Sequence, residues 1–179
     1  PLPLINPDEY TYGHLARSIA DGDGLTWRGE DIALRSALYI YAIVPAWLGD
    51  STTDAYRIAK AQGAFLLCLT ALPVWIVARR LLTPGLALLC AGMVLAGTWM
   101  TTVGSLLTEN LALPLATAAF AAIIVAVWAP GGRAGWLALV LSALAAWARM
   151  QCVALVAVLF VALILDAIAA PEPTRERLR

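Results

Sequence analysis

Two acidic sites in this sequence have the residue types needed for acid–base chemistry. Asp8 and Glu9 are adjacent near the start, and Glu109 stands alone between two long apolar segments. A carboxylate can accept the proton of an attacking hydroxyl group. Asn6 and Pro7 precede the acidic pair in a pattern typical of a helix start, so helix capping is the alternative role for Glu9.

Basic residues beside apolar segments are candidates for binding an anionic group. Arg35 precedes the apolar segment 36–48, and Arg57 and Lys60 lie at the start of the next one. Their side chains can bind a lipid phosphate. They can equally extend to the lipid headgroups only to keep the charge hydrated. The sequence leaves both roles open.

Arg149 and Gln151 lie between two other apolar segments. Charged groups at membrane depth are costly and tend to pair or to line a polar cavity, so Arg149 is a candidate partner for Glu109. An exposed helix start capped by Thr108 is the alternative for Glu109. His14 and the three cysteines lack the spacing of metal ligands, so the residues themselves predict no metal site.

The composition is typical of a membrane protein. Hydrophobic residues make up 61% of the 179 residues and charged residues 13%, whereas a soluble domain carries roughly a quarter charged residues. The formal net charge of zero gives no reason to expect a nucleic-acid partner. Lys60 is the only lysine among many arginines, which is typical of a GC-rich bacterial genome. We expect a multi-pass protein of the bacterial inner membrane, with membrane lipids as partners.

The elements that must position these residues are helices. An amphipathic helix on the membrane surface is expected from Asn6 to the Asp21–Gly24 stop, followed by a loop at 25–33. The segment 34–49 is short for a span and predicts an interfacial or re-entrant helix. The expected transmembrane helices are 57–78, 85–103, 107–128, 134–148 and 151–169.

The fold class is therefore all-α, a polytopic membrane helix bundle with an N-terminal extracytoplasmic loop that carries short amphipathic helices. We expect that loop at 1–56, a bundle of about five helices at 57–170, and a cytoplasmic loop or tail at 171–179. The start without Met, close to an acidic stretch, suggests a piece of a larger protein.

The arginines predict which loops share a side. Arg79, Arg80 and Arg133 follow the first and third expected spans, and three further arginines follow the fifth. Basic loops face the cytoplasm. The opposite, outer side then receives the acidic pair, Glu109 and Arg149.

The segment from Asp8 to Leu25 resembles the first outer loop of the GT-C membrane glycosyltransferases. The similar group is the dolichyl-phosphate-mannose–protein mannosyltransferase-like and aminoarabinose transferase-like enzymes. The acidic pair, Tyr12 three residues after Glu9, an Ala-Arg pair and a glycine-rich exit carry the resemblance. Later pieces that look similar are Leu38-Tyr39, Asp54–Arg57, Ala59-Lys60, Thr108–Leu111 and Arg149–Gln151.

The resemblance implies transfer of a sugar, with inversion, from a polyprenyl-phosphate donor to an extracytoplasmic protein, lipid or glycan. Asp8, or Glu9 beside it, would be the general base. Arg35, Arg57 or Lys60 would hold the donor phosphate. The polar cavity would include Tyr12, Tyr39, Glu109, Arg149 and Gln151. The resemblance leaves a divalent metal open.

The sequence also departs from the family pattern. The segment Leu34–Ala37 lacks the expected prolines, which weakens the role of Arg35. The family's first transmembrane helix and C-terminal half are absent, so this piece is expected to be inactive alone. The alternatives are a transporter or channel fragment with Glu109 and Arg149 lining a path, or a non-catalytic membrane subunit. The acidic outer loop favours the transferase.

Overall fold

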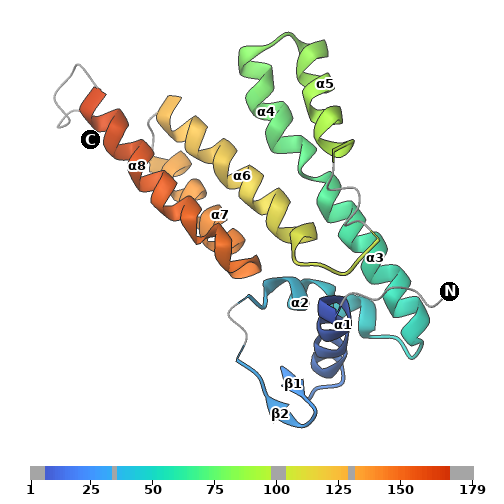
Figure 1. The fold of residues 1–179 in the computed structure, drawn as a ribbon. Coiled ribbons are helices and arrows are strands. Elements are labelled where there is room, and N and C mark those ends of the chain that lie inside the picture. The colour runs from blue at the N-terminus through green and yellow to red at the C-terminus, as the bar shows by residue number, and fades with distance from the viewer. Residues whose placement is uncertain (1–6, 34–35, 98–103, 129–131, 170–179) are drawn as a thin grey trace.

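A computed structural model describes residues 7–33, 36–97, 104–128 and 132–169 of the chain, and these residues are mostly helical. The all-α class is confirmed in this sense. Figure 1 shows short elements at one end of two groups of long helices, with α6 between the groups. The short elements are α1 (Pro7–Ala20), β1 (Thr26–Trp27), β2 (Glu30–Asp31), α2 (Leu38–Ile43) and the 3-10 turn η1 (Val44–Trp47). The long helices are α3 (Thr52–Cys68), α4 (Ala71–Leu81), α5 (Pro84–Leu95), α6 (Glu109–Trp128), α7 (Gly132–Ala148) and α8 (Ala154–Ala169). The 3-10 turn η3 (Met150–Val153) lies between α7 and α8.

Helix α1 does not present a free apolar face, as a helix on a membrane surface would. Its Leu15 and Ala16 are fully buried against α2, η1 and α3. Gly13 brings α1 close to that core, because a Cβ there would lie 2.8 Å from the Tyr56 hydroxyl. The N-terminal elements therefore have a small hydrophobic core of their own.

The segment predicted as a loop at 25–33 contains a short antiparallel hairpin, in which Thr26 pairs with Asp31. Arg28 and Gly29, the two residues of its turn, both have positive φ angles, at 55° and 85°. This matches a two-residue type I′ turn, which suits the twist of paired strands. The Trp27 ring packs on His14, with ring centroids 4.9 Å apart, and so holds the hairpin against α1.

The predicted short helix at 34–49 is present as α2 and η1, with Pro45 at the start of the 3-10 turn. Helix α3 begins after Ser51, whose hydroxyl accepts a hydrogen bond from the Asp54 amide at 3.3 Å. Helix α3 passes into α4 through a short turn at Leu69 and Thr70. Pro73 cannot donate to the carbonyl group of Leu69 four residues earlier, and this oxygen accepts from the Leu72 amide at 3.1 Å instead.

Within the described residues, three helices are long and apolar enough to cross a membrane: Thr52–Leu81, Glu109–Trp128 and Met150–Ala169. Helices α5 and α7 are also apolar but shorter, so the expected bundle of about five membrane-spanning helices is supported in part. The helix expected at 85–103 ends at Leu95, ahead of Gly97, and residues 98–103 lie outside the described part. The first predicted span begins earlier, at Thr52.

Helix α6 contacts α3, α4, α7 and α8 and so forms the centre of the bundle. Gly63 of α3 faces Asn110 of α6, and a Cβ at Gly63 would lie 2.8 Å from the Asn110 Nδ2 atom. The start of α6 and the α7–η3 junction lie at the end that carries α1 and α2 (Figure 1). Arg79, Arg80 and Arg133 lie toward the opposite end, as the charge alternation predicts.

Candidate functional site

The site is centred on an ion pair between Glu109, the first residue of α6, and Arg149, which follows α7. Arg149 has an extended backbone, with φ −152° and ψ 121°, and this interrupts the helix before η3. Its Nε donates to Oε1 of Gln151 at 3.1 Å. Thr108 donates its hydroxyl hydrogen to Oε2 of Glu109 at 3.3 Å. The predicted pairing of Glu109 with Arg149 is therefore confirmed.

Both residues line a cavity of about 420 Å³ between α6 and the η3–α8 segment. Gln151 lines the same polar end. Farther along the helices the walls are apolar, with Leu113 and Ala116 on α6 and Leu155 on α8. The cavity thus combines a charged mouth with an apolar interior, which is the form of a site for an amphipathic molecule.

Tyr12 links α1 to this ion pair. Burial raises the pKa of Tyr12, and the negative charges of Asp8 and Glu109 raise it further. A hydrogen bond with Thr108 and the positive charge of Arg149 act in the opposite direction. Tyr12 is therefore close to side chains from both α1 and the start of α6. It also lies one helical turn after Asp8, so the two residues share a face of α1.

Tyr39 of α2 is fully buried behind Tyr12, and the two rings meet edge to face with centroids 6.0 Å apart. Burial strongly raises the pKa of Tyr39. The amide nitrogen of Asn110 donates to the Ser105 carbonyl oxygen at 2.9 Å. The Tyr39 hydroxyl and Asn110 Oδ1 atoms are both buried, and the contact of Tyr39 with the Asn110 side chain opposes the effect of burial on the Tyr39 pKa.

Glu9 forms an ion pair with another helix, and Asn6, its expected capping partner, lies outside the described residues. Glu9 is buried, and its Oε1 lies 2.9 Å from Nζ of Lys60 on α3. Its side chain is 5% exposed, whereas that of Lys60 is 41% exposed. Glu9 therefore ties α1 to α3, and the charge of Lys60 is directed at Glu9. Asp8, in contrast, is exposed on the other face of α1.

Two of the residues predicted to bind the donor phosphate, Arg57 and Lys60, are not among the described residues that line this cavity. Arg57 has a side chain that is 77% exposed and pairs with Asp54 of its own helix at 3.4 Å. Lys60 pairs with Glu9, and Arg35 lies outside the described residues. Arg149 is the cation among the residues that line this cavity, where the sequence analysis placed it.

Ser36 was not singled out by the sequence pattern, although it contacts the site. The Ser36 hydroxyl oxygen accepts a hydrogen bond from the Met150 amide at 3.1 Å and so anchors the residue beside Arg149. Thr108 and Asn110 were indicated by the sequence, because both belong to the Thr108–Leu111 piece of the resemblance. The contact of Ser36 joins residues 114 positions apart, and no local pattern reveals it.

Comparisons with family models, curated proteins and solved structures found no match to this chain. Among the residues that the structure describes, no three His, Cys, Asp or Glu side chains gather into a group suited to a metal ion.

Proposed function

We propose that this protein is an integral membrane glycosyltransferase that moves a sugar from a polyprenyl-phosphate donor to an acceptor outside the cytoplasm. The observation that carries the proposal is the Glu109–Arg149 pair at the charged mouth of an otherwise apolar cavity. Tyr12 of α1 lies near this mouth, and Asp8 is one helical turn from Tyr12 on the same face of the helix. The resemblance of the Asp8–Leu25 segment to GT-C enzymes supports the same activity.

The cavity suits a donor that is both lipid and anion. The isoprenoid chain would lie against Leu113, Ala116 and Leu155, at a depth where apolar walls meet membrane lipid. The phosphate would lie at the mouth, where the Arg149 guanidinium can donate two parallel hydrogen bonds to its oxygens. Gln151 fixes the guanidinium through its contact with Nε.

In the proposed reaction, a hydroxyl oxygen of the acceptor attacks the anomeric carbon of the sugar from the side opposite the phosphate. A new carbon–oxygen bond forms while the bond from the anomeric carbon to the phosphate oxygen breaks. The electron pair stays on the polyprenyl phosphate, whose charge Arg149 stabilises. The hydroxyl proton passes to the carboxylate of Asp8. Inversion at the anomeric carbon follows from the single displacement.

The structure divides the acidic pair in a way that favours Asp8 as the base. Glu9 is buried and bound to Lys60, so its carboxylate faces the protein core. Asp8 is exposed and on the face of α1 that carries Tyr12. Tyr12 keeps its proton near neutral pH, because its pKa is raised, and its hydroxyl can hydrogen-bond the sugar or the acceptor.

Substitution of Asp8 by Asn in the intact protein tests this role. We expect the turnover number for a labelled polyprenyl-phosphate sugar to fall about 100-fold or more, the usual effect of losing a general base. Asp54→Asn is the matched control, because Asp54 is also an exposed acid in the first turn of a helix. Transfer that continues at the normal rate in a folded Asp8→Asn protein would refute the catalytic assignment.

A further inference from the structure

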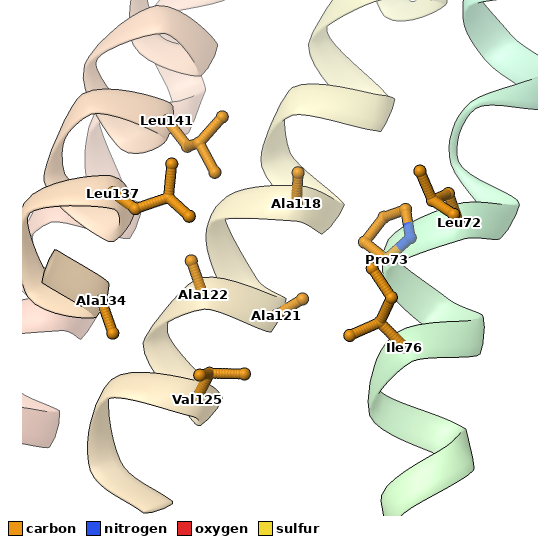
Figure 2. A pocket seen from close by; sticks show the side chains of 10 residues that line it. All are labelled: Leu72, Pro73, Ile76, Ala118, Ala121, Ala122, Val125, Ala134, Leu137 and Leu141. Atoms are coloured by element: carbon orange, nitrogen blue, oxygen red, sulfur yellow. The ribbon is translucent and has the colours of Figure 1, made fainter. Parts of the chain in front are cut away.

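A second cavity, of about 240 Å³, lies between α4, α6 and α7, in the half of the bundle that is away from the Glu109–Arg149 pair. Figure 2 shows Leu72 and Ile76 of α4 on one side of α6 and Leu137 of α7 on the other side. The lining residues of α6 are mainly alanines, including Ala121 and Ala122. Small side chains on a central helix leave a slot between its larger neighbours.

Cations lie one helical turn beyond this slot. Arg79 and Arg80 follow Ile76 by three and four residues, so they lie about 5 Å farther along α4. Arg133 directly precedes Ala134, which lines the cavity on α7. In the described parts of these helices, Asp166 of α8 is the one acid near this end. The mouth of the slot therefore carries an excess of positive charge.

Two of these arginines are held in place by aromatic rings. The guanidinium carbon of Arg80 lies 6.0 Å from the ring centroid of Trp128, which brings α4 and α6 together at the end of the slot. Arg79 lies 5.2 Å from the ring of Trp75. A guanidinium over a ring uses its flat face, so its N–H groups in the plane can still donate to an anion.

We propose that this cavity binds an anionic phospholipid of the surrounding membrane. One acyl chain occupies the slot beside Ala121 and Ala122, and the phosphate accepts hydrogen bonds from Arg79, Arg80 and Arg133. Charge complementarity selects this occupant, because basic pockets between membrane helices favour anionic headgroups. A second protein helix seated here would have to bring acids of its own to the arginines. The proposal does not depend on glycosyl transfer.

The test measures lipid retention by native mass spectrometry of the full chain in detergent. The probes are phosphatidylglycerol and phosphatidylcholine with the same two oleoyl chains. We expect phosphatidylglycerol to be retained at least about fivefold better. This lower bound is the effect of a single arginine near an anionic headgroup. Arg80→Gln should lower this preference severalfold, and a triple Gln variant at positions 79, 80 and 133 should abolish it. Arg57→Gln, an exposed arginine at the other end, is the matched control.

Filling the slot tests the acyl-chain part separately. Ala121→Leu should reduce retention of both lipids at this site, whereas the arginine variants affect only the anionic one. Equal retention of the two lipids by the unchanged protein, or no response to Arg79→Gln and Arg80→Gln, would overturn the proposal. Loss of a dimer on Ala121→Leu would assign the slot to a second copy and overturn it too. If the triple variant does not fold, the single substitutions at exposed Arg79 and Arg80 still decide the question.

Discussion

Nζ of Lys60 lies 2.9 Å from Oε1 of Glu9, and this contact gives two adjacent acids different roles. Glu9 is buried and joins α1 to α3, whereas Asp8 stays on the exposed face next to Tyr12. An acidic pair at a helix start can thus place one carboxylate in the core and leave the other at the surface. The helical turn separates the two side chains by about 100° around the axis, so they cannot face the same surroundings.

Removal of the Lys60 charge should destabilise the N-terminal elements. In Lys60→Met, the buried Glu9 carboxylate loses its partner, which is costly at a buried site. Lys60 is 41% exposed and partly screened by solvent, so we expect a loss of about 1–2 kcal/mol, below the value for a fully buried pair. Thermal unfolding in detergent measures it. Adding Glu9→Gln should recover part of the loss, and a further loss in the double variant would contradict the ion-pair argument.

Arg149 should affect the chemical step through the leaving phosphate. We expect Arg149→Gln to lower the turnover number about 100-fold, because the charge that it stabilises grows in the transition state. Arg149→Lys keeps the charge but loses the planar guanidinium group, so its activity should lie between that of the unchanged protein and that of Arg149→Gln. The measurement is steady-state transfer at varied donor concentration.

The Glu109→Gln/Arg149→Gln double variant separates this role from a structural one. It removes both charges, so no unpaired charge is left at the mouth of the cavity. If Arg149 serves only to neutralise Glu109, the double variant should regain both stability and activity. If it binds the phosphate, stability should return while transfer stays low.

The charge pattern was enough to predict which residues share an end of the bundle. The alternation of basic loops placed Glu109 and Arg149 opposite Arg79 and Arg133, and it needs only the order of apolar segments along the chain. Span lengths were less predictable. The run at 85–103 carries no charged residue, yet its helix ends at Leu95. Gly97 and Thr98 follow, and mean hydropathy does not register such a helix stop.

The Glu109–Arg149 pair could be predicted from the sequence, whereas the contacts of Lys60 and Ser36 with distant segments could not. The resemblance assigned Lys60 to the donor phosphate, and extension to the lipid headgroups was the alternative. Its partnership with Glu9 depends on how α1 packs against α3, which the sequence of neither helix specifies. The hydrogen bond from the Met150 amide to Ser36 likewise depends on how distant segments pack together. Helix identity is a local property, whereas ion-pair partners follow from the tertiary arrangement.

Gly63 should not tolerate a side chain, because α3 and α6 approach each other most closely there. The Cβ of Gly63→Ala would lie 2.8 Å from Nδ2 of Asn110, which donates to the Ser105 carbonyl oxygen. We expect a loss of about 1–3 kcal/mol from overpacking, together with lower activity, because Glu109 is adjacent to Asn110. Gly92→Ala on α5 meets nothing within 4 Å and should be neutral or stabilising. Equal thermal stability of the two variants would show that the contact is not tight.

Stability should decline at alkaline pH more steeply than the exposed tyrosines alone would cause. Folding raises the pKa of Tyr12 and Tyr39 above the ordinary value of about 10. The neutral forms are favoured in the folded protein, so their contribution is fully present below about pH 10 and is lost as the pH rises toward the folded-state pKa. Tyr39→Phe removes the ionisable group, and its melting temperature should fall less between pH 9 and about pH 12. Tyr41→Phe, at an exposed ring of the same helix, should follow the unchanged protein. If the melting temperatures of Tyr39→Phe and Tyr41→Phe fall in parallel, the pKa of Tyr39 would be the same in the folded and unfolded states, contrary to its burial.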